Sequence, residues 1–136
     1  MTVQEIRKTF FAYRNGMLAD SLRFHGDPHE VIFGLEIPRI AEIARMNQPS
    51  AELADELWAD RESRECRLLA SYLFPVEETG MEKCIALAAD VRNQEEADML
   101  AFRLFKRVAF AADLLGELEK RPDCRRAAKA LRDHLS

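Results

Sequence analysis

The sequence predicts an all-α protein, and three observations support this. Apolar side chains recur at spacings of three and four residues along nearly the whole chain, as they do on the buried face of a helix. Only the segment 30–37 has the β-branched and aromatic composition of an extended strand. The breaks between helical patterns are short, so neighbouring helices are expected to pack as antiparallel pairs. Short helix pairs in series favour a HEAT-like α-α superhelix; because the chain shows no strict repeat, an orthogonal helical domain is the alternative.

Length and composition are typical of a globular domain. The 136 residues are 48% apolar and 32% charged, enough for a sizeable core, so we expect one domain over residues 1–136. No apolar run approaches the roughly twenty residues of a membrane helix. The charged N-terminal decapeptide is unlike a secretory signal, and a cytoplasmic protein is therefore expected. The odd number of widely spaced cysteines predicts buried thiols rather than disulfides or a zinc site: Cys66, Cys84 and Cys124.

Five helices are expected in the first half of the chain, over residues 3–14, 17–24, 38–46, 51–59 and 62–74. The first is predicted to end at a left-handed stop formed by Asn15-Gly16. The Gly-Asp-Pro sequence at 26–28 cannot continue the second and predicts a loop. Ser50 is a candidate N-cap for the fourth helix, and Pro75 ends the fifth.

The second half contains four more helical patterns, which brings the expected total to nine. Thr79 and Glu82 are typical of a capping box that opens the first of them, and Asn93 with Glu96 is typical of the cap of the next. The last two patterns cover residues 111–119 and 123–135.

The net charge of −4 conceals a basic C-terminal quarter. Residues 1–102 carry 11 Lys and Arg against 19 Asp and Glu, a balance of −8, whereas residues 103–136 carry 9 against 5, a balance of +4. Three of these cations follow the i, i+4, i+7 spacing of one helix face. Such a face can bind DNA phosphates in a salt-sensitive way, and the alternative is a solubilising surface. The candidate DNA-binding residues are Arg103, Lys106, Arg107, Arg121, Arg125, Arg126, Lys129 and Arg132.

Other chemical signals are weak. Two histidines and two acids lie within residues 25–30, a composition that could ligate a metal, but Pro28 prevents the helix that would place them on one face. A polar turn is therefore expected, and no metal site is assigned. Phrases typical of serine hydrolases, Walker nucleotide sites or dinucleotide-binding loops are absent, so neither a hydrolase nor a nucleotide-binding protein is expected.

Three segments together resemble the AlkD-type DNA alkylation-repair family. They are residues 31–44 (VIFGLEIPRIAEIA), 53–58 (LADELW) and 65–70 (ECRLLA). Family members carry phrases of the form FGV-x-x-P-x-LR-x-IA, then LA-x-x-LW, then E-x-R-x-LA. Each phrase alone is generic helical sequence, and their order and spacing make the resemblance specific. It covers residues 31–74 well and the remainder loosely.

The resemblance implies a HEAT-like superhelix whose concave face holds duplex DNA and, in active members, a glycosylase that releases N3- or N7-alkylated purines. The alkylated purine is cationic and leaves readily, so such an enzyme needs to stabilise an oxocarbenium-like sugar and place a water. A carboxylate held against aromatic rings suffices. The resemblance implies no metal or organic cofactor.

The chain departs from the family where active members carry a tryptophan-rich stretch and a catalytic Asp. The corresponding segment 93–101 holds no aromatic side chain: Glu96 and Ala97 stand where tryptophans would, and Ala101 stands where the catalytic carboxylate would. Trp58 belongs to the LW phrase and is expected in the core. The chain is also shorter than typical members. We therefore expect a shortened, catalytically degenerate relative, and we assign no catalytic residue.

Three hypotheses follow from the resemblance. The leading one is a non-catalytic HEAT-like module that binds duplex DNA or another protein. The second is an active glycosylase for N3/N7-alkylated purines, with Asp98, Glu95 or Glu96 as a substitute carboxylate. The third is a protein–protein scaffold without nucleic-acid binding. An incomplete superhelix exposes an apolar terminal repeat, which predicts a homo-oligomer; no membrane partner is expected.

Overall fold

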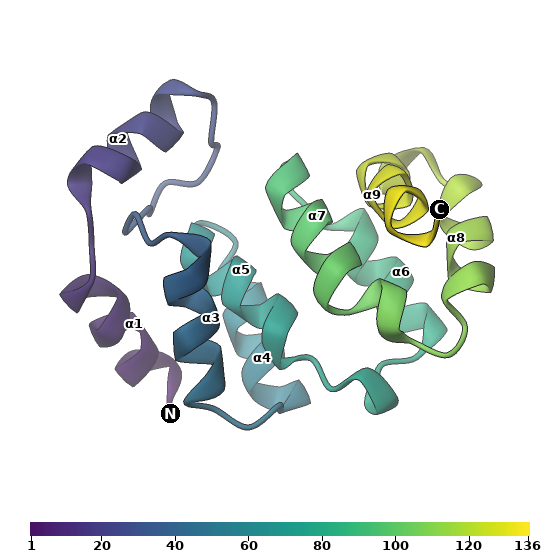
Figure 1. Cartoon of the computed structure of the whole chain (residues 1–136), viewed down its shortest axis with the longest axis horizontal. Coiled ribbons are helices and arrows are strands. Elements are labelled where there is room, and N and C mark those ends of the chain that lie inside the picture. Colours follow the sequence, from purple (N-terminus) through teal and green to yellow (C-terminus); the bar gives the residue numbers. More distant parts are fainter. The chain divides into compact units, whose positions relative to one another are not determined.

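The computed structural model describes all 136 residues and is entirely helical (Figure 1). It contains nine α-helices, three short 3-10 helices and no β-strand; a single isolated β-bridge joins Val31 and Ser63. The chain forms two compact units, Met1–Phe74 and Pro75–Ser136. The prediction of an all-α protein with nine helices is confirmed.

The first unit contains α1 (Val3–Ala12), α2 (Gly16–Phe24), α3 (Ile37–Arg45), α4 (Ala51–Ala59) and α5 (Arg64–Leu73). The second unit contains α6 (Met81–Ala89), α7 (Gln94–Arg103), α8 (Ala111–Glu119) and α9 (Arg125–Leu135). Its 3-10 helices are η1 (Val76–Glu78), η2 (Phe105–Arg107) and η3 (Pro122–Cys124). None of these helices combines the length and the apolar composition that crossing a membrane requires.

Packed helix pairs organise each unit. In the first, α4 packs along α5, and α3 lies against the same helix. In the second, α7 packs along α9 rather than along α8, its neighbour in sequence, because the chain leaves the helix at Leu104 and turns through η2. Helix α8 also packs on α9. Pairs of short helices of this kind are the units of HEAT-like superhelices, so the predicted class of fold is confirmed.

Helix α5 is the most buried element of the first unit, with nine of its ten residues buried. The fully buried Glu65 carboxylate accepts hydrogen bonds from the backbone N–H groups of Phe33, Gly34 and Leu35 at 2.9, 3.1 and 3.3 Å. The Arg64 guanidinium lies 2.6 Å from the same carboxylate and donates to the Leu35 carbonyl at 3.0 Å. These bonds satisfy the backbone of an extended segment that has no sheet partner. They join Phe33 and Gly34 of the FG phrase to Glu65, the first residue of the E-x-R phrase.

Gly34 allows α2 to approach this extended segment. Its φ is +85°, and a Cβ atom added there would lie 2.2 Å from the Asn15 carbonyl oxygen. Both the backbone conformation and the space therefore favour glycine. The Asn15 N–H donates to the Phe33 carbonyl at 2.9 Å, which fixes the start of α2 on the segment.

Trp58 lies in the core, as predicted. Its side chain is 7% exposed, and its ring meets the ring of Phe74 edge-on with centroids 6.5 Å apart. The buried Arg67 guanidinium lies 3.5 Å from the Trp58 ring centroid and donates to the Trp58 carbonyl at 2.8 Å. The sole tryptophan of the chain therefore has a packing role.

Two predicted helix ends are wrong. Gly16 does not have a positive φ, and Asn15 is the N-cap of α2, with its side chain accepting two N–H groups of the first turn. An Asn side chain satisfies open donors at a helix start, and this role replaces the predicted stop. The N-cap of α6 is Gly80, which has no side chain to accept a hydrogen bond, and the Thr79 hydroxyl donates to the Pro75 carbonyl at 2.6 Å.

Other predicted caps are confirmed. Ser50 caps α4, and Asn93 caps α7 by accepting the Glu96 N–H at 3.0 Å. The Glu96 carboxylate in turn accepts the Arg92 N–H at 2.9 Å. The three cysteines are free and buried, as predicted.

Candidate nucleic-acid interface

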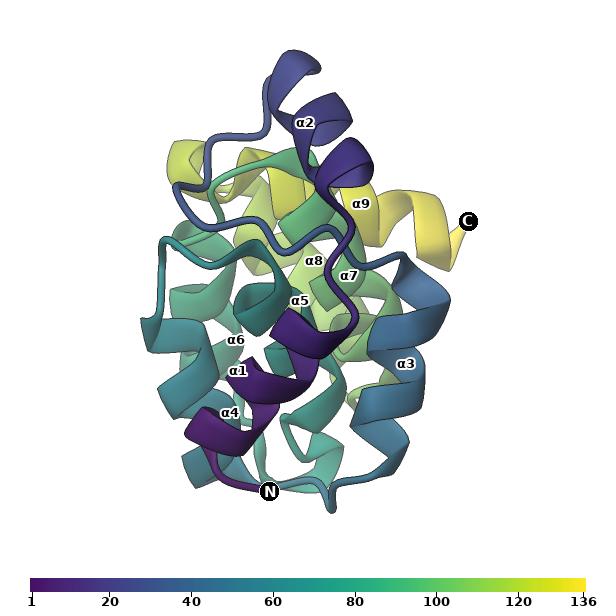
Figure 2. The same cartoon turned by 90° about the vertical axis from the view of Figure 1, so that its left-hand side faces the viewer.

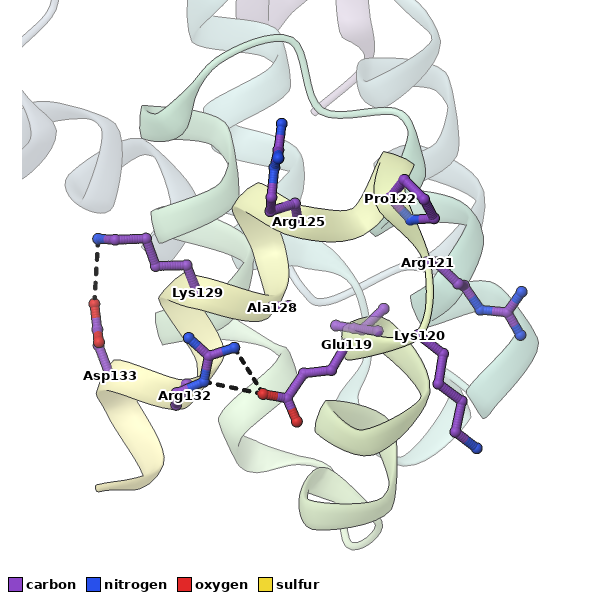
Figure 3. A pocket seen from close by; sticks show the side chains of 10 residues that line it. Glu119, Lys120, Arg121, Pro122, Arg125, Ala128, Lys129, Arg132 and Asp133 are labelled. Atoms are coloured by element: carbon purple, nitrogen blue, oxygen red, sulfur yellow. Dashed lines mark hydrogen bonds and ion pairs between the residues drawn. The ribbon is translucent and has the colours of Figure 1, made fainter.

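A groove lies between the end of α8 and helix α9 in the second unit (Figure 3). Its volume is about 670 Å³. The apolar part of its lining is Leu118, Pro122 and Ala128. The charged part is Glu119, Lys120, Arg121, Arg125, Lys129, Arg132 and Asp133.

The local sequence explains the two sides of the groove. Arg121 precedes a proline and is extended, with φ −116° and ψ 117°, so the chain breaks after α8 and re-enters a helix through η3. The buried side of α9 consists of Ala127, Ala128, Ala130 and Leu131. Arg125, Lys129 and Arg132 are exposed, as their i, i+4, i+7 spacing predicts.

The groove is cationic. Five cationic and two anionic side chains line it, a balance of +3. Nε and Nη2 of Arg132 lie 3.0 and 2.6 Å from one carboxylate oxygen of Glu119, and Lys129 Nζ lies 3.7 Å from the Asp133 carboxylate (Figure 3). Exposed ion pairs of this kind contribute about 0–1 kcal/mol, so a phosphate can replace either carboxylate at little cost.

The start of α9 is basic. Arg125 and Arg126 are its first two residues, and the first turn has neither an acidic residue nor a side-chain cap. The helix dipole disfavours cations at this end by about 0.3–1 kcal/mol each at low ionic strength. An anion bound at this end would offset that repulsion and accept hydrogen bonds from the guanidinium groups.

The structure places the other predicted residues outside the groove. Lys106 Nζ lies 3.8 Å and Arg103 Cζ lies 5.6 Å from the ring centroid of Phe102. Arg107 is exposed and donates to the Arg103 carbonyl at 3.4 Å. The Arg126 carbonyl accepts a hydrogen bond from an α7 side chain. The eight predicted residues therefore comprise four that line the groove, three at the end of α7 and in η2, and Arg126.

Two features of this surface were not predicted. Phe102 is 42% exposed, and its ring lies 5.4 Å from that of His134; nothing in the sequence distinguishes it from a core phenylalanine. The counter-ions of the groove were also missed. The i, i+4 spacing of Lys129 and Asp133 is a sequence signal for such a pair, whereas no local signal joins Glu119 to an arginine on the next helix.

The candidate substitute carboxylates differ in environment. Glu96 is 1% exposed, and its carboxylate accepts the backbone N–H of Arg92 just before α7. Glu95 is half-buried. Asp98 is exposed and accepts a hydrogen bond from the Gln94 side chain at 2.9 Å. Asp98 is therefore the most accessible of the three.

Two of the positions that the sequence resemblance places opposite the family's tryptophans and catalytic carboxylate lie in the core. Ala97 and Ala101 are fully buried. The next residue after each of them, Asp98 and Phe102, is exposed. Because residues four apart share one face of a helix, this carboxylate and this ring lie on the same side of α7.

Thiol chemistry has no support in the structure. Burial raises the pKa of the Cys66 thiol to about 11, that of Cys84 to about 12 and that of Cys124 to about 11. The thiols are therefore protonated at neutral pH and are poor nucleophiles. No group of three or more His, Cys, Asp and Glu side chains is arranged to hold a metal ion.

Packed helix pairs and a cationic groove are compatible with an all-helical nucleic-acid-binding protein. The family model of the DNA alkylation repair enzymes matches residues 6–131, which is nearly the whole chain. The chain therefore belongs to this family, and the resemblance found in residues 31–74 is confirmed. No curated protein and no solved structure matches the chain.

Proposed function

We propose that the protein binds duplex DNA through the groove between α8 and α9. The observation that carries this proposal is the balance of +3 among the lining side chains of a chain whose net charge is −4. Membership in a DNA repair family suggests DNA as the polyanion that these cations bind. Phosphate contacts carry no sequence information, so the binding is expected to be independent of sequence.

Arg121 and Arg125 are expected to contribute most to this binding. Neither guanidinium forms an ion pair, whereas Lys129 and Arg132 must first exchange a carboxylate for a phosphate. Arg125 also lies at the N-terminus of α9, where a phosphate is favoured by the helix dipole.

We propose further that this binding is non-catalytic. The glycosylase reaction that the resemblance implies needs a carboxylate held against aromatic rings. The corresponding positions Glu96, Ala97 and Ala101 are all buried; the first two hold no aromatic ring, and Ala101 holds no carboxylate. DNA that contains 7-methylguanine or 3-methyladenine is expected to lose these bases at the background rate, even with excess protein. Release proportional to protein concentration would contradict this part of the proposal.

Fluorescence anisotropy with a labelled duplex tests the binding. Four phosphate contacts give a slope of log K against log salt of about −3.6, so affinity is expected to fall roughly 100-fold between about 50 and 200 mM salt. The variant Arg121→Ala/Arg125→Ala is expected to reduce the slope by about 2.

The matched control is Lys8→Ala/Arg45→Ala, which removes the same charge from exposed positions of the first unit. Its slope is expected to equal that of the unmodified protein. Equal losses in both variants would show that only net charge matters and would contradict the assignment to the groove. Absence of binding at low salt would exclude DNA as the ligand of the groove and would favour a protein partner.

One observation favours a second candidate, an active glycosylase for N3/N7-alkylated purines. Asp98 and Phe102 present a carboxylate and an aromatic ring on the same side of α7. Base release that Asp98→Asn abolishes, with duplex affinity unchanged, would support this candidate. Base release at the background rate in the unmodified protein would exclude it.

A further inference from the structure

An exposed aromatic ring on α7 lies among side chains that the α8–α9 groove does not use. Phe102 is 42% exposed. The His134 ring of α9 lies 5.4 Å from the Phe102 ring and is tilted by 45°, and Lys106 Nζ of η2 lies 3.8 Å from the Phe102 centroid. The guanidinium carbon of Arg103 lies 5.6 Å from the same centroid. We call the cluster of Phe102, His134, Lys106 and Arg103 the Phe102 platform.

Packed helices hold the Phe102 platform in place. Helix α7 packs along α9, and η2 contacts both helices. At the starts of the two helices, the Gln94 side chain on α7 donates to the Arg126 carbonyl on α9 at 3.3 Å. At their ends, Phe102 meets His134 in the last turn of α9, next to the C-terminus marked in Figure 2. Contacts at both ends of the pair therefore give the exposed ring a defined position within the second unit.

The surroundings of the exposed ring are cationic. Arg103, Lys106 and Arg107 lie within five consecutive residues, and Arg107 is exposed and donates to the Arg103 carbonyl at 3.4 Å. The acids on the same side of α7 are Asp98 and Glu95, one and two turns before the ring. Positive charge is thus concentrated at the end of α7 that carries the ring, and a ligand that reaches the ring meets this charge.

A flat apolar ring edged by cations fits a single-stranded nucleotide. Proteins bind single strands with a cationic surface that contacts phosphates and with exposed aromatic rings on which bases stack. The bases of a duplex are stacked on one another, so only an unpaired base offers its face to a side chain. We propose that the Phe102 platform binds an unpaired base of DNA, with the base stacked on Phe102 and its phosphate bound by Lys106. This inference rests on the proposed DNA binding and adds single-stranded segments to its ligands.

The Lys106 ammonium over the ring does not prevent this stacking. An exposed contact between a cation and a ring changes an equilibrium constant by about 2- to 5-fold. Stacking of one base on an aromatic side chain changes it by about 5- to 150-fold. The base therefore displaces Nζ from the ring, and the flexible four-carbon stem of lysine lets the ammonium move to the neighbouring phosphate.

Fluorescence anisotropy with a labelled single strand and a labelled blunt duplex separates stacking from phosphate binding. The single strand is an oligothymidine about 12 nucleotides long. Phe102→Ala is expected to weaken binding of oligothymidine at least about 5-fold and to change duplex affinity less than about 2-fold. Because this substitution removes no charge, the slope of log K against log salt is expected to stay the same. Lys106→Ala is expected to reduce the slope for oligothymidine by about 0.7.

The matched control is Phe11→Ala in the first unit. Phe11 is 56% exposed, and a guanidinium, that of Arg14, also lies 3.8 Å from its ring centroid. Its replacement is expected to leave both affinities unchanged. Equal losses in Phe11→Ala and Phe102→Ala would overturn the assignment to the Phe102 platform.

Two further substitutions separate the aromatic face of Phe102 from its bulk. Phe102→Trp keeps an aromatic face and is expected to bind oligothymidine at least as tightly as the unmodified protein. Phe102→Leu keeps apolar bulk without the face and is expected to bind as weakly as Phe102→Ala. Circular dichroism checks that each variant is folded. Full affinity in Phe102→Leu would overturn the stacking.

A photochemical cross-link locates the bound base. A strand that contains 5-iodouracil forms a covalent bond with an aromatic side chain stacked on that base when it is irradiated. Trypsin cleaves after Arg92 and Arg103, so the cross-link is expected on the peptide of residues 93–103. A cross-link confined to other aromatic residues would overturn the proposal.

The two binding assays distinguish this inference from the proposed duplex binding. Duplex binding with no oligothymidine binding, or with oligothymidine binding that Phe102→Ala does not weaken, would overturn the Phe102 platform and leave the α8–α9 groove. Oligothymidine binding that depends on Phe102, without duplex binding, would support the platform and contradict the function proposed for the groove.

Discussion

Replacement of Glu65 tests whether one buried carboxylate holds the first unit together. Glu65→Ala leaves three backbone N–H groups without their acceptor and the buried Arg64 without its 2.6 Å carboxylate partner. An unsatisfied buried donor costs about 1–3 kcal/mol, and loss of one partner of a buried ion pair costs about 3–5 kcal/mol. Since these effects overlap, we expect Glu65→Ala to lower the free energy of unfolding by about 4 kcal/mol.

Glu65→Gln separates the charge from the shape of this side chain. The amide keeps one carbonyl oxygen as an acceptor but turns the second oxygen into a donor, so we expect a loss of about 2 kcal/mol. Urea unfolding followed by circular dichroism measures both variants. Glu56→Gln, at an exposed position of α4, is the control and is expected to change the free energy of unfolding by less than about 0.5 kcal/mol. A change below about 1 kcal/mol in Glu65→Ala would refute the role assigned to the carboxylate.

Three further outcomes are expected. Gly34→Ala is expected to destabilise the protein by about 3 kcal/mol or more in the same urea assay, because the new Cβ meets the Asn15 carbonyl oxygen at a φ of +85°; an unchanged midpoint would contradict this. Asn93→Ala is expected to cost about 1 kcal/mol through loss of the α7 cap, and a neutral result would show that the cap is dispensable. The three thiols are expected to react with a thiol reagent at pH 8 only at the rate of unfolding, since their pKa values of about 11 to 12 keep them protonated and burial keeps them inaccessible. Rapid labelling of the folded protein would contradict that expectation.

Periodicity and capping residues predicted most helices because these signals are local. Helix α8 covers residues 111–119 as expected, and the caps at Ser50 and Asn93 are confirmed. The wrong ends at Asn15 and Thr79 arise where one side chain can satisfy backbone groups in two ways. In both cases contacts with other segments of the same chain decide which backbone groups the side chain bonds. A local sequence pattern contains no information about these contacts.

Long-range polar contacts could not be predicted from one sequence. The sequence resemblance includes Glu65 and Gly34, but their function as acceptor and close-approach position depends on segments about thirty residues apart meeting in space. The pairing of α7 with α9 could not be predicted from the local sequence either, because the turn at Leu104 and η2 directs it.

The candidate interface was predicted in part. Helical spacing placed Arg125 and Lys129 on one face, and in the structure both line the groove. Counting charged residues could not distinguish these groove-lining residues from Arg103 and Lys106, which lie against Phe102 instead. A net positive segment predicts a cationic surface, but the direction of each side chain depends on the turns between helices.

An NMR titration of the isotopically labelled protein with a short duplex would identify the DNA-binding surface directly. We expect the largest amide and arginine side-chain shifts in residues 118–133, with Arg121 and Arg125 among the strongest, and reversal of these shifts on addition of salt. Shifts concentrated in α1 and α2, or no shifts at low ionic strength, would contradict the assignment of the α8–α9 groove as the DNA interface.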